Sequence, residues 1–398
     1  MHSRTSLPNF FLLLFSIVLV TLMGEGIARS MDIPRLFPDS SFSRKIGREL
    51  PVNAEQQYPC NDDCIHQGHN AVVRFNGIGI RDIDHDWQKP EGVKRIVVLG
   101  DSMTSGEEVP LEQTMFQQLQ KLLDRYSSEQ WEVISLGVRG ASTLEAMIML
   151  EEYGLRYDPD IVVLQTCIAN DIFNNSIQAL GVCESTPFRP YAVQTTDGTL
   201  RRTTGQSFRN TLRHHSALFV AMETVFLKMK HRIGGPLLPS MLVDILEEEM
   251  TERRESLPVD CFSLNQIPPE YQPPLAREGW EITERLLTQL SELLRENGIP
   301  LVAYDVPLER TIMYPEGDRW QAYASGLPIP LLRGYGPKRL RSLFEKTGDP
   351  FLPLLPMLDA QHDTVLPYWN HHLNPDGQYI VAEAVLNMLE KQGFVHIK

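Results

Sequence analysis

Short apolar runs that alternate with helical patterns constrain the fold of this chain more than any other feature. Three runs, over residues 95–99, 131–136 and 160–165, have the length and the continuous apolar character of buried parallel strands. Apolar residues recur at helical spacing over residues 115–126 and 143–153. Strands that alternate with helices predict an α/β fold, with a mostly parallel sheet covered by helices on both faces.

The alternation lapses and then resumes in the C-terminal third. Residues 176–275 break the pattern and are predicted to form an insertion. A helix that ends at Asn297-Gly298 follows, and then a strand over residues 299–306. Residues 308–368 are rich in Pro and are predicted to be irregular. A last helix is predicted to begin at Asn374-Pro375, with Asn as the N-cap and Pro at the first helical position.

The amino terminus predicts export. Basic residues precede an apolar run over residues 10–23, which is the arrangement of a signal sequence. Residues 1–30 are therefore expected to be a cleaved signal peptide or an N-terminal membrane anchor. The protein is expected to be periplasmic or extracellular, and to meet the membrane only through this segment. Residues 31–92 are predicted to be an extended lead-in to a main domain over residues 93–398.

Composition and motifs argue against several classes of partner and cofactor. The chain has 37 Lys and Arg against 51 Asp and Glu, with no basic block, so nucleic acid is not expected as a partner. It has no Walker A loop, no G-x-G-x-x-G after a strand and no H-E-x-x-H, so no nucleotide, flavin or metal cofactor is expected. Cys60, Cys64, His66 and His69 could ligate zinc, but their spacing matches no standard finger.

The five cysteines are too few for a fold built on disulfides. In an oxidising compartment, Cys60 and Cys64 are close enough in sequence to bridge. Cys183 and Cys261 flank one long segment and could pair across it. Cys167 lies in the third predicted strand region and is expected to be a buried free thiol.

Polar residues follow the three predicted N-terminal strands, at the point where each strand ends. Ser102 follows the first strand, Gly140 the second and Asn170 the third. The carboxyl ends of parallel strands meet at one edge of a sheet, where open α/β folds place their sites. A glycine lets a backbone N–H approach a substrate, and an Asn amide can donate to a developing oxyanion. His372, just before the last helix, is placed to act as a general base toward a serine.

Together these segments resemble the SGNH (GDSL-type) hydrolases, a family of serine esterases and lipases. The matching blocks are Gly100-Asp101-Ser102, Gly140, Asn170-Asp171 and His372-Leu373-Asn374-x-x-Gly377. Residues 75–81 also look like the lead-in of exported bacterial members. The resemblance covers roughly residues 72–175 and 276–395.

The resemblance implies a flavodoxin-like three-layer α/β/α sandwich with an inserted cap segment. It implies that Ser102 is the nucleophile and His372 its base. It also implies an oxyanion hole made of the Ser102 N–H, the Gly140 N–H and the Asn170 side chain.

The acid that should orient the histidine is missing from its usual place. Family members carry an Asp two or three residues before the His, where this chain has Asn370 and Trp369. Asn370 can accept a hydrogen bond from the imidazole, although it cannot stabilise the imidazolium with a charge, and it is the first candidate. Asp363 and a backbone carbonyl are the alternatives. His371 is a competing base, but His372 alone has the family's register.

The leading hypothesis is a serine esterase that hydrolyses a carboxylic ester, O-acetyl or short acyl, through an acyl-serine intermediate. Its substrate would be a small-molecule or glycan ester. One alternative is an O-acyltransferase acting on a cell-surface polysaccharide, in which a sugar hydroxyl replaces water. Another is a non-catalytic carbohydrate-binding protein on the same fold.

Overall fold

The structure, a computed structural model, describes residues 6–30, 40–43, 48–57, 72–176, 183, 189–195, 198–203, 216, 218–219, 222, 261–314, 321, 324–361, 368–369 and 371–398. The Cys60–His69 cluster and most of the predicted insertion lie outside these residues. The domain boundaries drawn from the sequence therefore stay predictions.

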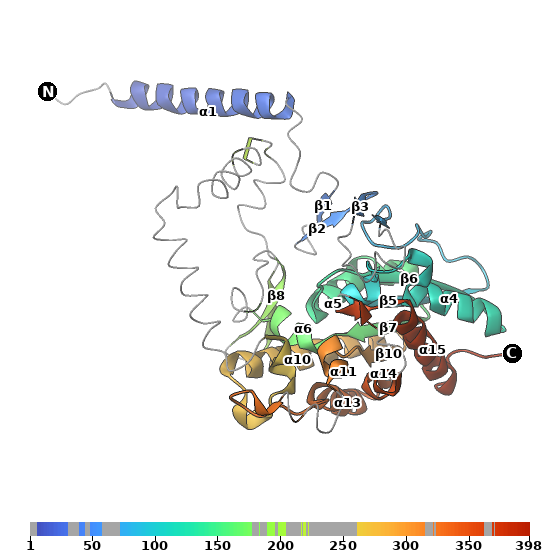
Figure 1. The fold of residues 1–398 in the computed structure, drawn as a ribbon. Helices are drawn as coiled ribbons and strands as arrows, with labels where there is room; N and C mark the ends of the chain where they lie inside the picture. Colours follow the sequence, from blue (N-terminus) through green and yellow to red (C-terminus); the bar gives the residue numbers. More distant parts are fainter. Residues whose placement is uncertain are drawn as a thin grey trace.

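Five parallel strands form the central sheet (Figure 1). They are β5 (Val93–Gly100), β6 (Gln130–Gly137), β7 (Ile161–Thr166), β10 (Leu301–Asp305) and β11 (Phe351–Pro353). Their spatial order is β11-β10-β7-β5-β6, and every neighbouring pair is parallel. Numbered along the chain, this is the 2-1-3-4-5 order of flavodoxin-like sheets. The predicted α/β class and the mostly parallel sheet are confirmed.

Helices cover both faces of the sheet because successive strand residues point to opposite sides. On β5, Ile96 and Val98 belong to one hydrophobic cluster, and Val97 and Leu99 belong to the other. The helices on the first face are α4 (Met115–Tyr126), α14 (Leu355–Gln361) and α15 (Pro375–Lys391), and those on the second are α5 (Thr143–Glu152), α6 (Ile168–Asn174), α10 (Pro274–Glu296) and α13 (Tyr335–Thr347). The result is a three-layer α/β/α sandwich.

Side chains cap the starts of two of these helices, one of them at the predicted Asn374. The Ser142 side chain accepts from the Glu145 N–H at 3.2 Å, and the Glu145 carboxylate accepts from the Ser142 N–H at 2.9 Å. This capping box begins α5. At the start of α15, Asn374 Oδ1 accepts from the Gly377 N–H at 2.8 Å, and Pro375 occupies the first helical position.

Residues 308–368 contain more regular structure than their composition predicts. The helix α13 begins after Gly334, whose φ is 70°, and Pro337 lies in its first turn, where a missing N–H costs nothing. Leu340 and Phe344 of this helix are fully buried. β11 is only three residues long and is defined by its pairing with β10. Tertiary packing therefore overrides the irregular local pattern in this region. The short helix α11 (Glu309–Met313) also lies here.

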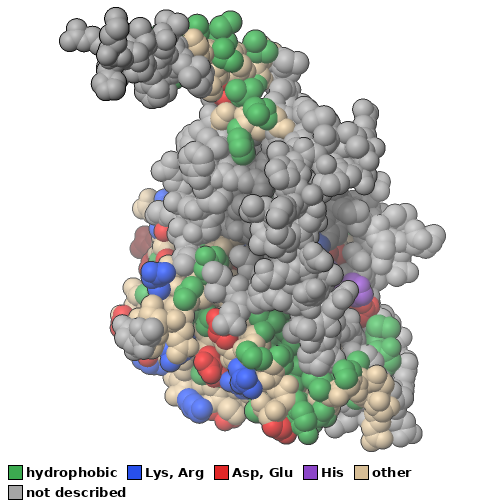
Figure 2. Space-filling model, turned by 90° about the vertical axis from the view of Figure 1, so that its left-hand side faces the viewer, with side chains coloured by type: hydrophobic (Ala, Val, Ile, Leu, Met, Phe, Trp, Pro, Cys, Tyr) green, Lys and Arg blue, Asp and Glu red, His purple; other side chains and the backbone are tan. Residues whose placement is uncertain are grey.

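The elements outside the sandwich are short, with one exception. Four antiparallel pairs are formed by β1 (Ser40–Ser43) with β2 (Arg48–Pro51), β3 (Glu55–Gln57) with β4 (Val72–Arg74), β8 (Tyr191–Gln194) with β9 (Leu200–Thr203), and β12 (Tyr368–Trp369) with β13 (His372–Leu373). The exception is α1 (Ser6–Ser30), in which several large apolar side chains, among them Phe15, Val20 and Leu22, are exposed, at the top of Figure 2. Among the described residues, no helix is both long and apolar enough to cross a membrane.

The end of the predicted lead-in packs on the domain. Arg95 lies fully buried on β5, and its guanidinium donates to Glu132 Oε2 at 2.7 Å and to the Asp86 carbonyl at 2.8 Å. Asp82 Oδ2 accepts from the Ser135 N–H of β6 at 2.8 Å. Ile80 is buried in the core. Residues 80–86 are therefore tied to the sheet and are part of its fold.

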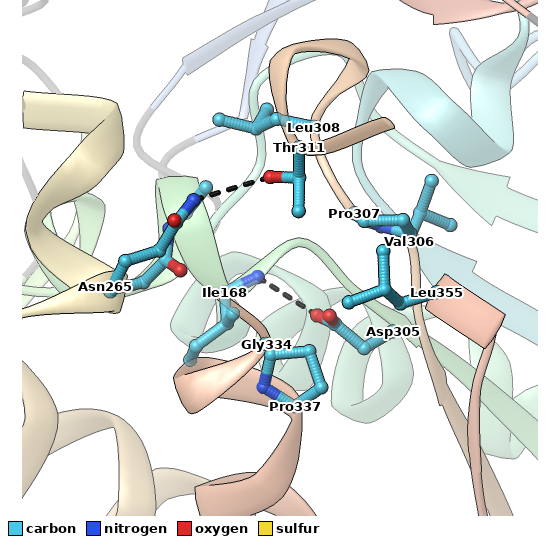
Figure 3. A pocket seen from close by; sticks show the side chains of 12 residues that line it. Ile168, Asn265, Asp305, Val306, Pro307, Leu308, Thr311, Gly334, Pro337 and Leu355 are labelled. Carbon is cyan, nitrogen blue, oxygen red and sulfur yellow. Dashed lines mark hydrogen bonds between the residues drawn. The ribbon is translucent and has the colours of Figure 1, made fainter. Parts of the chain in front are cut away.

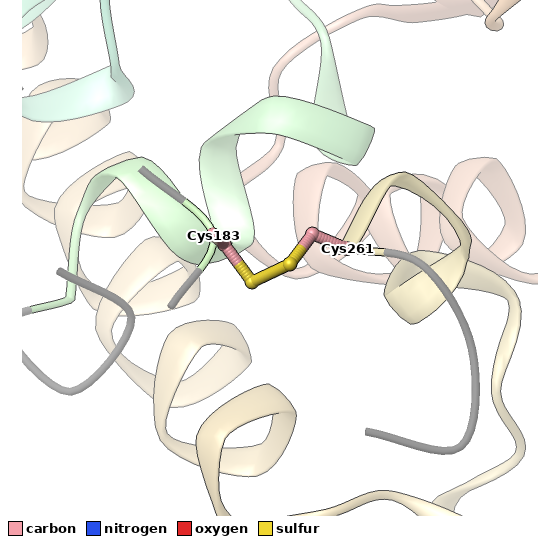
Figure 4. Close-up of a disulfide and its surroundings, with 2 residues drawn as sticks. All are labelled: Cys183 and Cys261. Atoms are coloured by element: carbon pink, nitrogen blue, oxygen red, sulfur yellow. A yellow bond between two sulfur atoms is a disulfide. The ribbon is translucent and has the colours of Figure 1, made fainter. Parts of the chain in front are cut away.

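A disulfide joins Cys183 to Cys261, a pairing that the sequence left open as one possibility (Figure 4). The two residues are 78 apart in sequence, with Cα atoms 5.6 Å apart. Cys261 begins the 3₁₀ helix η4 (Cys261–Gln266), which packs against α6. Cys167 is a buried free thiol, as predicted. The disulfide therefore joins the two ends of the segment 184–260 covalently.

Replacing Cys183 and Cys261 together by Ser should lower the free energy of unfolding by about 2–5 kcal/mol, because the unfolded chain loses a long closed loop. Thermal melting followed by circular dichroism measures the change. Wild-type protein melted in dithiothreitol is the control and should match the double variant. Equal melting of the oxidised wild type and the double variant would contradict the prediction.

Candidate active site

Ser102 lies at the carboxyl edge of the sheet, in the turn that follows β5. It is the first residue of a four-residue helix, α3 (Ser102–Ser105). Asp101 caps this helix, because its Oδ1 accepts from the Met103 N–H at 2.9 Å. Ser102 is only 6% exposed, so its hydroxyl is presented from a nearly buried position.

Two glycines let this turn press against the ends of the strands. A Cβ on Gly100 would lie 2.2 Å from Thr104 Oγ1 and 2.4 Å from Gln165 Oε1. A Cβ on Gly137, at the end of β6, would lie 2.7 Å from Thr104 Cγ2. Neither position has room for a side chain. The turn that carries Ser102 can therefore pack this closely on the sheet only because both strands end in glycine.

His372 meets Ser102 from the other end of the chain. Its Nε2 lies 2.9 Å from Ser102 Oγ, although the two residues are 270 apart in sequence. Gln378, in the first turns of α15, fixes the segment that carries the histidine. Its Oε1 accepts from the Met115 N–H at 2.7 Å, and its Nε2 donates to the Met103 carbonyl at 3.4 Å. The structure therefore brings together the serine and the histidine that the sequence singled out.

The competing base, His371, does not reach the serine. Its backbone has a φ of 68°, and its Nδ1 pairs with Glu309 Oε2. The side chain is 81% exposed. Because adjacent residues of β13 and its turn point in different directions, only His372 faces Ser102, and the alternative of His371 as the base is wrong.

The second nitrogen of His372 has a partner that the sequence reasoning missed. Glu108 Oε1 lies 3.0 Å from His372 Nδ1, and the Glu108 side chain is fully buried. Asn370 and Asp363, which the sequence proposed for this place, lie outside the described residues. The only sequence feature that marks Glu108 is the acidic pair Glu107-Glu108, whose second member is six residues after Ser102.

Asn170 and Gly140 lie beside the serine turn. The Asn170 side-chain Nδ2 donates to Asp101 Oδ2 at 3.1 Å, directly next to Ser102. Gly140 has a φ of 63°, a conformation that glycine adopts without strain. Its carbonyl accepts from Asn174 Nδ2, at 3.5 Å, on the same helix as Asn170. The loops after β5, β6 and β7 are thus joined around one point.

Buried carboxyl groups hold the helix that carries Asn170. Asp171 accepts from the Thr143 N–H at 2.8 Å and from the Cys167 N–H at 3.1 Å, and burial raises its pKa to about 8. Burial also raises the pKa of Asp101, although the donors Met103 and Asn170 and the charge of His372 oppose the shift. In Asp305, burial raises the pKa to about 7. The start of α6 is therefore fixed by carboxyl groups whose pKa is raised by burial.

Figure 3 shows the small cavity behind α6 in which Asp305 lies. Asp305 Oδ1 accepts from the Ile168 N–H at 3.2 Å and from Thr166 Oγ1 at 3.1 Å. Across the cavity, Gln266 Nε2 donates to Thr311 Oγ1 at 3.2 Å. Residues of α6, η4 and α13 are among those that line this cavity, and Ser102 is not one of them. The hydrogen bond from the Ile168 N–H to Asp305 holds the start of α6 here.

Comparison with known proteins gives matches of structure only. No family model and no curated protein matches the sequence. The esterase EstA from Pseudoalteromonas sp. has 10% identity and a TM-score of 0.36, over 75% of this chain and 98% of its own. The lipase/acylhydrolase from Enterococcus faecalis has 13% identity and a TM-score of 0.35, over 77% and 98%. A catalytic mutant of the acetylxylan esterase Axe2 from Geobacillus stearothermophilus has 13% identity and a TM-score of 0.38, over 74% and 94%.

At this level of similarity the matches give no residue of the present chain a role. The case for a function rests on the geometry of its own side chains.

Asp305→Asn should flatten the fall of stability with rising pH. The pKa of Asp305 is raised to about 7 in the folded state, above its unfolded value near 4, so the folded state holds more protons between these values. Its contribution to stability is therefore present below about pH 4 and is lost as the pH rises through about 7. The Asn variant keeps both contacts, because both reach Oδ1.

The free energy of unfolding, measured in urea at several pH values from 4 to 8, tests this expectation. The control is Asp124→Asn, an exposed change on α4 that should leave the wild-type slope unchanged. Identical slopes in Asp305→Asn and the wild type would refute it.

Proposed function

We propose that this protein is a serine esterase that hydrolyses a carboxylic ester through an acyl-serine intermediate. The observation that carries the proposal is the 2.9 Å contact between Ser102 Oγ and His372 Nε2 at the carboxyl edge of the sheet. A hydroxyl in hydrogen-bond reach of an imidazole is the arrangement that activates a serine nucleophile. The site that the sequence predicted supports the same reading.

The reaction begins when Ser102 Oγ attacks the ester carbonyl. The hydroxyl proton passes to His372 Nε2 as the new C–O bond forms, and the carbonyl electron pair moves to the oxygen. The tetrahedral intermediate then collapses, and the imidazolium returns its proton to the leaving alcohol. Water repeats the sequence on the acyl-serine, releasing the acid and free Ser102.

The oxyanion is stabilised by donors from three loops. The Ser102 N–H, the Gly140 N–H and the Asn170 side chain supply them. The Asn170 amide supports this role because one of its two N–H groups donates to Asp101, which orients the amide beside Ser102 and leaves the second N–H for the substrate oxygen. Asp101 therefore acts as a positioning residue for this donor.

The substrate proposed is an O-acetyl or short acyl ester of a small molecule or a glycan. The proposed place of action is outside the cytosol. The Cys183–Cys261 disulfide supports this location, since disulfides persist in oxidising compartments and are rare in reducing ones.

Ser102→Ala should abolish labelling by a fluorophosphonate probe and hydrolysis of p-nitrophenyl acetate, because the nucleophile is removed. Gel fluorescence measures the loss of labelling, and the absorbance of released p-nitrophenolate measures the loss of hydrolysis. Ser105→Ala, three residues along the same short helix, is the matched control and should still be labelled. Labelling of Ser102→Ala at the wild-type level would exclude the assignment.

Asn170→Ala should lower kcat by about 10²–10³, the cost of losing one oxyanion donor, with a small change in KM. The kinetics of p-nitrophenyl acetate hydrolysis measure it. Asn174→Ala, one turn along α6, provides a comparison that removes an amide bound to the Gly140 carbonyl. A kcat for Asn170→Ala equal to that of the wild type would remove Asn170 from the oxyanion hole.

A further inference from the structure

A short turn after the nucleophile carries a second carboxyl group into the site. Residues 106–110 link α3 to the 3₁₀ helix η1 (Leu111–Gln113). Glu108 in this turn has no exposed side-chain surface, and its Oε1 lies 3.0 Å from His372 Nδ1. The opposite ring nitrogen of His372 lies 2.9 Å from Ser102 Oγ. The three side chains therefore form one line of contacts, from hydroxyl to imidazole to carboxylate.

The order of these contacts favours one tautomer of the histidine. A carboxylate accepts hydrogen bonds, so a carboxylate beside Nδ1 favours the neutral imidazole that carries its proton there. Nε2 is then left with its lone pair toward the Ser102 hydroxyl. This is the state that a general base needs, and it is the task that an Asp performs in the Ser-His-Asp triad.

The backbone of the turn is held from outside by Arg81. Its Nη1 donates to the Ser105 carbonyl at 2.8 Å and also to the Gly106 carbonyl, and its Nη2 donates to the Val109 carbonyl. Gly106 turns the chain with a φ of 57°. Arg81 is itself buried. The guanidinium thus fixes the carbonyls on both sides of Glu108, and the position of its carboxylate is set by the fold.

Positive charge near Glu108 offsets the cost of burying a carboxylate. Arg139 Nη1 lies 3.4 Å from Glu108 Oε1 and 2.9 Å from Glu107 Oε2. Burial lowers the pKa of Arg81 to about 10, and the charges of Glu107 and Glu108 oppose that shift, so Arg81 stays protonated at neutral pH. Two guanidinium groups therefore lie at the turn that carries Glu107 and Glu108.

We propose that Glu108 is the carboxylate that positions His372, in place of the acid expected near Asn370. It accepts from Nδ1–H in the resting state. When Ser102 attacks, the hydroxyl proton moves to Nε2, and Glu108 stabilises the resulting imidazolium without itself taking a proton. The proton then leaves with the alcohol, and the imidazole returns to its starting tautomer. This inference rests on the proposed esterase function.

The test compares Glu108→Gln with the wild type in the hydrolysis of p-nitrophenyl acetate over a range of pH. The Gln amide keeps the shape of the side chain and removes the charge. We expect kcat to fall by about 10²–10⁴ with little change in KM, since the corresponding Asp→Asn change in a Ser-His-Asp triad costs about 10⁴. The loss should be present at every pH tested, because the Gln side chain carries no charge at any of them.

Neighbouring charges require controls. Asp101 lies near His372. Arg139 and Arg81 lie near Glu108, and Glu107 in the same turn pairs with Arg139. Glu107→Gln is the matched control: it removes a carboxylate that also binds Arg139 but is not the one paired with His372. Its kcat should stay near that of the wild type. Glu108→Asp keeps the carboxylate, so its kcat should lie between those of Glu108→Gln and the wild type, and it tests the proposal if Glu108→Gln does not fold.

The outcomes separate this inference from the proposed function. A lower kcat in folded Glu108→Gln with a KM near that of the wild type, partly restored in Glu108→Asp, supports it. A wild-type kcat in Glu108→Gln overturns it, as does a Glu108→Asp variant whose kcat is no higher than that of Glu108→Gln. A comparable loss in Asn370→Ala or Asp363→Asn, with Glu108→Gln unaffected, overturns it in favour of those residues. Failure of the wild type to be labelled at Ser102 by a fluorophosphonate would instead refute the esterase function itself.

Discussion

The close approach of one short turn to the end of the sheet is the constraint on which the rest of the site depends. Gly100 and Gly137 have no room for a Cβ, because Thr104 and Gln165 fill the space above them. The turn can therefore sit directly on β5 and β6, and Asp101, Ser102 and the residues that follow take their places from it. A side chain at either glycine would lift the turn and separate Ser102 from groups that other strands supply.

Those other groups reach the turn through polar contacts at the same edge of the sheet. Asn170 arrives after β7 and is bound to Asp101, while His372 arrives before α15 and is bound to Ser102. β5 and β7 are neighbours in the sheet although helices separate them in the sequence. In a sheet of this order the strand connections diverge at that point, which leaves a crevice where loops from both sides meet. The topology thus accounts for why residues from distant parts of the chain converge there.

Much of this arrangement could be predicted from the sequence because it depends on local signals. Apolar runs predict β5, β6, β7 and β10, helical spacing predicts α5, and the capping residue Asn374 predicts the start of α15. Ser102, Asn170 and His372 could be identified from the sequence because each follows a strand or precedes a helix. α13 and β11 could not, since they lie in a Pro-rich stretch and their regular structure comes from tertiary packing.

Glu108 could not have been predicted in the same way. It lies in a turn with no periodic pattern, and its contact with His372 depends on Arg81, which binds the turn from 24 or more residues away in the sequence. Asn370 and Asp363 are the candidates that lie near the histidine in the sequence. Glu108 lies near the serine in the sequence, and it reaches the histidine only through the fold.

The spacing of Ser102 and Glu108 on one turn has a consequence for how the site comes into being. Two of the three groups in the line of contacts are joined by a few peptide bonds, so their relative placement is established as soon as β5, β6 and the Arg81 segment have folded. His372 is carried by a segment far from them in the chain, just before α15, and it takes its place only when α15 packs against α4. The serine is therefore without its imidazole until that helix has docked, so a complete site reports that two distant parts of the chain have come together.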